Sequence, residues 1–195
     1  MLGFYPPTEG TVTIGRQSLQ KISFKEWRKH CGVVMQEGFI FGDTIANNIV
    51  PDGNMIDKKR LLYAVEMANI RDFVESLPLK YNTKIGNTGQ GLSQGQKQRI
   101  LIARAVYKDP LYIFLDEATN ALDAKNERTI VENLDQFYKG RTVVVVAHRL
   151  STVKNAHQII VLDKGRIVET GNHASLIEEK GAYYNLVKNQ LELGN

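Results

Sequence analysis

The stretch that decides the fold runs from Leu92-Ser93-Gln94-Gly95-Gln96 to Leu111-Tyr112-Ile113-Phe114-Leu115, which is followed by Asp116-Glu117. The first segment predicts the start of a helix, because Ser93 with Gln96 fits a capping box and an apolar helical face follows. Asp109-Pro110 ends that helix, and the apolar run 111–115 predicts a strand. The middle of the chain therefore contains a loop, a helix and a strand that ends in two adjacent carboxylates.

Apolar runs and helical patterns alternate on both sides of this stretch. Strands are predicted near 11–14, 31–35, 142–146, 158–162 and 166–169, and helices near 61–77, 124–137, 173–179 and 182–192. This alternation predicts an α/β fold with a largely parallel sheet flanked by helices. The runs 142–146 and 158–162 are apolar without alternation, so we expect both strands to be covered on both faces.

Between Asp43 and Lys108 the pattern is helical only, which predicts an α-helical subdomain inserted into the sheet core. We therefore expect three parts. Residues 1–41 would form a first part of the core, residues 42–108 the helical subdomain, and residues 109–195 the second part of the core.

Composition narrows the class of protein. The chain has 195 residues, 43% hydrophobic and 24% charged, which suits one packed domain rather than a disordered chain. The net charge of +4 comes from Lys and Arg spread along the chain, so no nucleic acid is expected as a partner. No apolar run reaches the ~18–20 residues of a membrane span. Met1 to Pro7 lacks a signal-peptide pattern and Cys31 has no partner for a disulfide, so we expect a soluble intracellular chain.

Asp116 and Glu117 are the first candidates for a functional site. The carboxyl end of a buried strand is where α/β sheets place ligands. One carboxylate could ligate Mg²⁺ while the other polarises an attacking water. The alternative is an ordinary strand-to-turn Asp with an exposed neighbour.

The loop Ser93-Gln94-Gly95-Gln96 is the second candidate. It places a hydroxyl and open backbone N–H groups at a helix N-terminus, where the helix dipole also favours a phosphate. Gly95 lets a ligand approach the backbone closely. The alternative is an ordinary capping box.

Two further polar residues follow predicted strands. His148 comes after the valine run, and its imidazole could hold a γ-phosphate or orient a water; the alternative is a structural hydrogen bond. Gln36 follows the strand near 31–35 and could reach a metal or a water through its amide. Neither residue defines a site alone, but the order of all these features along the chain is informative.

In this order the motifs resemble the nucleotide-binding domain of ABC transporters over nearly the whole chain, which implies a P-loop NTPase-like core. Leu92 to Gln96 resembles the LSGGQ signature, with Gln94 in place of the first glycine. Leu111 to Asp116 resembles the Walker B strand, and Glu117 has the position of the catalytic base. The other matches are a D-loop at Asn120 to Asp123, a switch histidine at His148 and a Q-loop glutamine at Gln36.

The resemblance implies ATP and Mg²⁺ as cofactors and a second nucleotide-binding domain, packed head to tail, as partner. Ser93, Gln94, Gly95 and Gln96 would contact the γ-phosphate held by the partner's P-loop, and Asp123 would act in the D-loop. Asp116 and Gln36 would serve Mg²⁺, while Glu117 and His148 would act on the attacking water. A transmembrane domain would contact the region Phe39 to Ile49, which implies a cytoplasmic chain, peripheral on the inner face of the plasma membrane. The amino-acid sequences of residues 96–105 and 118–123 resemble those of exporters of peptides and bacteriocins.

The 195 residues contain no G-x-x-x-x-G-K-[ST], the loop that holds phosphates in this family. Met1 to Gly10 resembles the segment just after the P-loop helix, so the resemblance implies that the N-terminal strands and the P-loop are missing. Removal of a strand from inside the sheet would leave edges unpaired and an apolar face uncovered. Three hypotheses follow: part of an ATPase that cannot hydrolyse ATP alone, a non-catalytic partner that completes another subunit's site, or a gene fragment without function.

Overall fold

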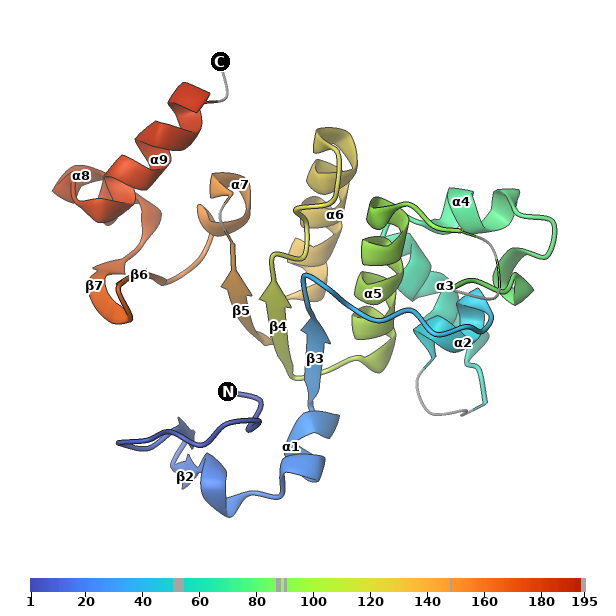
Figure 1. Cartoon of the computed structure of the whole chain (residues 1–195), viewed down its shortest axis with the longest axis horizontal. Coiled ribbons are helices and arrows are strands. Elements are labelled where there is room, and N and C mark those ends of the chain that lie inside the picture. Colours follow the sequence, from blue (N-terminus) through green and yellow to red (C-terminus); the bar gives the residue numbers. More distant parts are fainter. Residues whose placement is uncertain (51–54, 87–88, 90, 148, 194–195) are drawn as a thin grey trace. The chain divides into compact units, whose positions relative to one another are not determined.

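The computed structural model describes residues 1–50, 55–86, 89, 91–147 and 149–193 (Figure 1). The chain divides into two compact units, Met1–Val144 and Val145–Asn195. The predicted division into three parts, with boundaries after residues 41 and 108, stays a prediction.

The first unit is built on a sheet with the strand order β3-β4-β5. These strands are β3 (Cys31–Val34), β4 (Tyr112–Asp116) and β5 (Thr142–Val146), whose last two residues belong to the second unit. β3 and β4 are parallel, with Cys31 opposite Tyr112 and Val34 opposite Leu115. A parallel strand pair joined through helices confirms the predicted α/β class.

Helices fill the sequence between these strands and after β4. They are α1 (Phe24–Lys29), α2 (Ile45–Ile49), α3 (Lys58–Met67), α4 (Arg71–Ser76), α5 (Gln94–Lys108) and α6 (Ala124–Phe137). Short 3-10 turns lie at Leu19–Lys21 and Lys80–Asn82, and β1 (Thr13–Ile14) pairs with β2 (Gln17–Ser18) before α1. α5 is central, because it packs on α2, α3 and β3 and buries Ile100, Ile102 and Ala103 (Figure 1).

The helical pattern from Leu61 to Leu77 is divided between two helices. Asn69 lies between α3 and α4 with φ of 49°, a left-handed conformation that asparagine tolerates better than most residues. The run ends at Leu77, whose extended backbone precedes Pro78 as the sequence predicts. The apolar spacing thus predicted the helical state correctly but not the turn inside it.

The second unit contains a β-hairpin and two helices that cover one of its faces. After α7 (Leu150–Val153), β6 (Ile159–Asp163) pairs antiparallel with β7 (Arg166–Gly171), and both strands lie close to their predicted positions. α8 (His173–Glu179) and α9 (Ala182–Leu193) follow. Their contact with the hairpin forms a small core, which consists of Ile159, Val161, Leu176, Tyr183 and Val187.

The expectation that the strands at 142–146 and 158–162 are covered on both faces is wrong. Val146 at the end of β5 is exposed, and so are Ile160 and Leu162 of β6, with Leu162 66% exposed. β5 is last in its strand order, and β6 pairs with β7 alone among the named strands of the described residues. An unbroken apolar run makes a strand suited to burial on both faces. Whether the faces are buried depends on which elements pack beside the strand.

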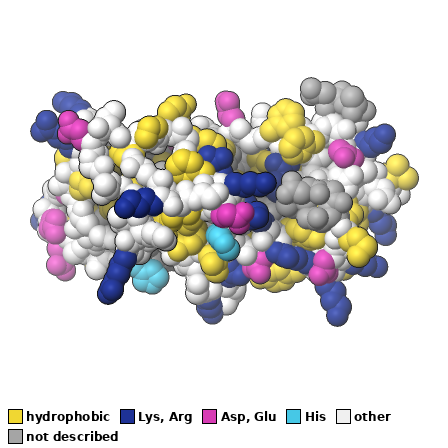
Figure 2. All heavy atoms as spheres, turned by 90° about the horizontal axis from the view of Figure 1, so that it is seen from below, with side chains coloured by type: hydrophobic (Ala, Val, Ile, Leu, Met, Phe, Trp, Pro, Cys, Tyr) yellow, Lys and Arg dark blue, Asp and Glu magenta, His cyan; other side chains and the backbone are white. Residues whose placement is uncertain are grey.

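Charged side chains are mixed on the surface. Figure 2 shows Lys and Arg interspersed with Asp and Glu and with apolar side chains on the face drawn. This agrees with the modest net charge of +4. Within the described residues, no helix combines the length and the apolar composition that a membrane span requires.

Candidate functional site

The Ser93 loop, defined as Leu92 to Gln96, has the geometry that the sequence predicts. Ser93 is the N-cap of α5, a helix of 15 residues, and its hydroxyl accepts the N–H of Gln96 at 3.2 Å. The Gln96 side chain accepts the N–H of Ser93 at 2.9 Å, which completes the capping box. Helix geometry gives the N–H groups of Gln94 and Gly95 no intrahelical acceptor, and Ser93 and Gln94 are exposed. The loop therefore presents donors and a helix dipole to a ligand outside the chain.

Gly95 joins this loop to a second one, the turn Asn120 to Asp123. A Cβ atom at Gly95 would lie 3.2 Å from the carbonyl oxygen of Ala121, so the two backbones approach closely here. Gln94, by contrast, points its larger side chain to an exposed position. The departure from a glycine at position 94 is thus accommodated outside the packed face, whereas position 95 favours glycine.

The carboxylate pair, Asp116 and Glu117, lies at the carboxyl end of β4. Asp116 is the last residue of the strand and Glu117 has φ of 48°. A left-handed conformation is uncommon for a glutamate and costs free energy, and such residues concentrate at functional sites. The side-chain amide of Asn120 donates to Glu117 Oε2 at 2.5 Å, and this fixes the carboxylate direction.

Gln36 lies at the same edge of the sheet as the carboxylate pair. Val34 pairs with Leu115 in the parallel ladder, and Gln36 and Glu117 each follow that pair by two residues. Gln36 is exposed, and Asp116 is half-buried. Both offer oxygen donors, and Mg²⁺ in proteins takes few protein oxygens beside phosphate and water. Gln36 and Asp116 together suit such a site. Among the described residues, no cluster of three or more His, Cys, Asp or Glu could hold a metal ion.

Asp123 is the N-cap of α6, directly before the helix predicted near 124–137. Its side chain accepts the N–H of Asn126 at 3.1 Å, which stabilises the helix start after the turn. Beneath the turn, the buried Thr119 hydroxyl donates to the buried Glu127 carboxylate at 3.3 Å. Sequence reasoning missed Glu127, because nothing in its spacing distinguishes a buried glutamate on α6 from an exposed one.

His148 lies outside the described residues. Its assigned role, to hold a γ-phosphate or orient a water, therefore stays a prediction. β5, the strand that precedes it in the sequence, ends at Val146.

A second exposed surface is formed by Phe39 and Phe41, which we call the aromatic pair. Their rings meet edge to face at a centroid distance of 5.1 Å, and Phe39 is 67% exposed. Arg104 of α5 holds their backbone, because it donates to the Phe39 carbonyl at 3.0 Å and to the Asn48 carbonyl at 2.6 Å. Burial lowers the pKa of Arg104. Sequence reasoning assigned the region Phe39 to Ile49 to a partner but missed Arg104, which is 56 residues from Asn48.

The backbone of Glu117 gives a test of stored strain. We expect Glu117→Asn to have a free energy of unfolding about 1 kcal/mol higher than Glu117→Ala, because both substitutions alter the bond from Asn120 while asparagine tolerates φ near 48° better than alanine. Urea unfolding followed by circular dichroism measures the difference. The same comparison at Asp116, on an extended backbone, is the control and should give no such difference. Equal effects of the two substitutions of Glu117 would contradict stored strain at this position.

The chain is similar to known proteins over nearly its whole length. A family model described as ABC transporter matches residues 1–120. An ATP-dependent lipid A-core flippase of Saccharophagus degradans is 45% identical over 190 residues, which make up 97% of this chain and 32% of that protein. Multidrug resistance protein 1 of Entamoeba histolytica is 43% identical over 190 residues, 96% of this chain and 15% of that protein.

A solved structure of a bacterial Atm1-family ABC exporter with ATP bound is also similar. It aligns with a TM-score of 0.93 and 36% identity over 97% of this chain and 34% of that chain. The chain therefore spans about a third or less of the length of these relatives. The family match covers more than half of the chain, and the chain belongs to the ABC transporter family.

Proposed function

We propose that this chain is the ATP-binding part of an ABC exporter and that the Ser93 loop is its main contact with nucleotide. The observation that carries the proposal is the capping box at the start of α5, with Ser93 and Gln94 exposed beside Gly95. A hydroxyl, backbone N–H groups and the positive end of a 15-residue helix together suit a terminal phosphate. The similarity to an ATP-dependent flippase and to the structure of an exporter with ATP bound supports this assignment.

The nucleotide that this loop serves is held by a second nucleotide-binding domain. A phosphate needs several donors, and the 195 residues contain no G-x-x-x-x-G-K-[ST] to supply them. A partner domain with its own P-loop would bring ATP to the Ser93 loop in a head-to-tail dimer. In that dimer Gln94 and Gln96 would lie beside Ser93 and Gly95 at the γ-phosphate.

The carboxylate pair serves the other site of the same dimer. Asp116 and Gln36 would hold Mg²⁺, which neutralises phosphate charge when it is bound. Glu117 would accept a proton from the attacking water, and His148 would orient that water, while Asp123 fixes the turn between the two sites. Without its own phosphate loop this site does not turn over, so the 195-residue chain alone does not hydrolyse ATP.

The aromatic pair is the contact for a transmembrane domain. Exposed aromatic side chains held on a fixed backbone are typical anchors of protein interfaces. Phe39 and Phe41 meet this description, and Arg104 and Asn48 fix their backbone. Such a partner would keep the chain on the cytoplasmic side, peripheral to the inner face of the plasma membrane.

The exported substrate is assigned from the amino-acid sequences of residues 96–105 and 118–123, which resemble those of peptide and bacteriocin exporters. The relatives described above carry names of a lipid flippase and a multidrug protein, so they support an exporter without supporting a peptide substrate. We therefore propose a peptide as the exported substrate on the sequence resemblance alone. Transport of a labelled peptide by the complex with its transmembrane partner tests it, and transport of lipid alone would contradict it.

Two measurements test the proposed function. The pure chain should release no phosphate from ATP, and Glu117-dependent turnover at ordinary exporter rates would contradict this. The chain should form an ATP-dependent heterodimer on size exclusion with a full-length nucleotide-binding domain. That domain contains its P-loop, and its catalytic glutamate is replaced by glutamine. No complex under these conditions would contradict the role of the Ser93 loop, and a circular dichroism melt of the pure chain shows whether it is folded.

A further inference from the structure

Arg99 lies one helical turn after the Ser93 loop and connects three segments of the first unit. Its Nε donates to the Gly95 carbonyl at 3.3 Å. One terminal nitrogen donates to the Asn69 carbonyl at 2.7 Å and to the Asn126 Oδ1 at 3.4 Å. Burial lowers the pKa of Arg99, and the nearby Asp123 acts in the opposite direction. The guanidinium thus bonds α5, the α3–α4 turn and the start of α6 at once.

Asn126 is the second member of this network. Its Oδ1 also accepts from the Asn69 side-chain amide at 2.9 Å, and its own amide donates to Asp123 Oδ2 at 2.5 Å. Its backbone N–H donates to Asp123 Oδ1. Asn126 therefore connects Arg99 to Asp123. Asp123 is both the N-cap of α6 and the last residue of the Asn120–Asp123 turn.

The connection closes on itself. From Gly95 it passes through Arg99, Asn126 and Asp123 into the Asn120–Asp123 turn, where the Ala121 carbonyl lies against Gly95. A closed ring of contacts restrains both of its loops more than either contact restrains one loop alone. The ring joins the Ser93 loop to the turn that follows the carboxylate pair.

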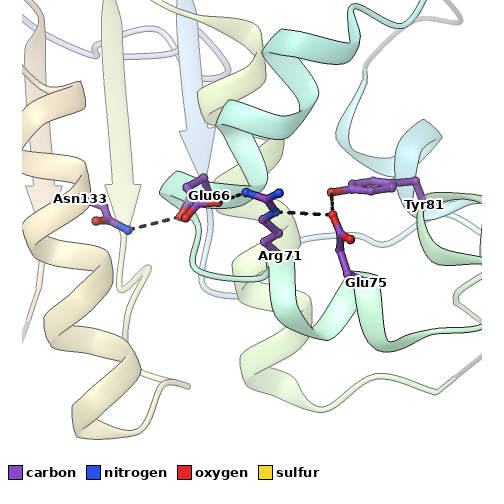
Figure 3. A network of polar contacts seen from close by, with 5 residues as sticks. All are labelled: Glu66, Arg71, Glu75, Tyr81 and Asn133. Carbon is purple, nitrogen blue, oxygen red and sulfur yellow. Dashed lines mark hydrogen bonds and ion pairs between the residues drawn. The ribbon is translucent and has the colours of Figure 1, made fainter.

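A separate set of contacts holds α3 and α6 together without Arg99. Figure 3 shows Asn133 of α6 directed at Glu66 of α3, and the Asn133 amide donates to the Glu66 and Met67 carbonyls at 3.3 Å. Arg71 pairs with Glu66 at 3.1 Å on the exposed side of the same region. Because these contacts do not involve Arg99, we expect α3 and α6 to stay packed when Arg99 is altered.

We propose that Arg99 is a positioning residue that fixes the Ser93 loop to the Asn120–Asp123 turn, so that the two loops enter their nucleotide sites as one rigid piece. The proposal rests on the proposed function, in which the loop serves the partner's nucleotide and the turn borders this chain's own site. A planar fork is needed, because its acceptors lie on three different segments and a single ammonium group does not reach all of them.

Arg99→Lys tests the proposal, with Arg128→Lys as its control. Arg128 is 84% exposed on α6 and pairs only weakly with Glu132 at its i,i+4 position. Loss of the fork should raise amide hydrogen exchange by about tenfold in the pure chain at Gln96 and at Leu122, whose N–H groups donate to Ser93 Oγ and to the Thr119 carbonyl. The ATP concentration at half-maximal heterodimer formation should rise by about tenfold as well. The control should leave both quantities unchanged.

Asn69→Gly is a second variant that reaches the same ring from its other side. Glycine keeps the left-handed backbone at φ of 49° and removes only the amide that bonds Asn126. Its effect on the exchange of both loops should have the same direction, and the double variant should show less than the product of the single effects.

Faster exchange at only one of the two loops, or wild-type exchange in Arg99→Lys, would overturn the proposal. The exchange experiment needs no partner, so it separates this inference from the proposed function. If the wild-type chain forms no heterodimer, the proposed function fails while the exchange result still decides the role of Arg99. If the heterodimer forms equally well with Arg99→Lys, the proposed function stands and the positioning role does not.

Discussion

Ser93→Asp is expected to raise the ATP concentration needed for heterodimer formation by about 100-fold, since a charge-assisted hydrogen bond is lost and a like charge is introduced. Aspartate is as good an N-cap as serine, so the side chain at position 93 still accepts the Gln96 N–H and caps α5. The carboxylate nevertheless occupies the position where the phosphate would accept the Ser93 hydroxyl. Size exclusion of the chain with an intact partner domain, over a range of ATP concentrations, measures the effect.

Ser93→Thr is the matched control for this prediction. Threonine keeps both the hydroxyl and the ability to cap the helix, so assembly should stay within about threefold of the wild type. The melting temperatures of both variants should be close to that of the wild type, because the exposed N-cap contact is kept in each. Assembly of Ser93→Asp at wild-type ATP concentrations would show that the loop is only a capping box.

Asn48→Ala is expected to lower the free energy of unfolding by about 3 kcal/mol, because several hydrogen bonds of one buried side chain are lost together. Asn48 is 1% exposed, and its Oδ1 accepts the Phe41 N–H at 2.8 Å and an Arg104 nitrogen at 3.3 Å. Its amide donates to the Phe41 and Thr44 carbonyls at 3.0 Å. Thermal unfolding followed by circular dichroism should show a midpoint lower by about 6–12 °C.

Asn47→Ala is the control, since it removes the same side chain from the neighbouring position of α2. Asn47 is exposed, and its amide bonds the Asp43 carboxylate at 3.1 Å. Substitution of an exposed residue of this kind usually changes stability by less than about 0.5 kcal/mol. Equal losses at positions 47 and 48 would contradict the assignment of Asn48 as the residue that fixes the aromatic pair.

Local features of the site could be predicted from the sequence. The Ser93 capping box and the Asp123 N-cap involve residues only three positions apart, so the sequence contains both partners of each contact. The place of Asp116 at the end of a strand also follows from the apolar run before it. What could not be predicted was the left-handed backbone of Glu117, because glutamate has no preference for that conformation.

Contacts between distant segments could not be predicted. Arg99 and Asn126 are 27 residues apart, and Arg104 and Asn48 are 56 residues apart. An arginine on a helix has the same local pattern whether it faces solvent or bonds three other segments. The exposed faces of β5 and β6 have the same cause, because their apolar sequences do not specify which strands lie beside them.

The sequence by itself determined the family, the α/β class and the capping box at Ser93, because motifs and caps depend on residue types at short, fixed spacings. Only the tertiary structure decided that Gly95 lies against Ala121 and that Arg99 and Asn126 join the two loops. The physical reason is that side-chain hydrogen bonds between distant segments form only after the helices have packed.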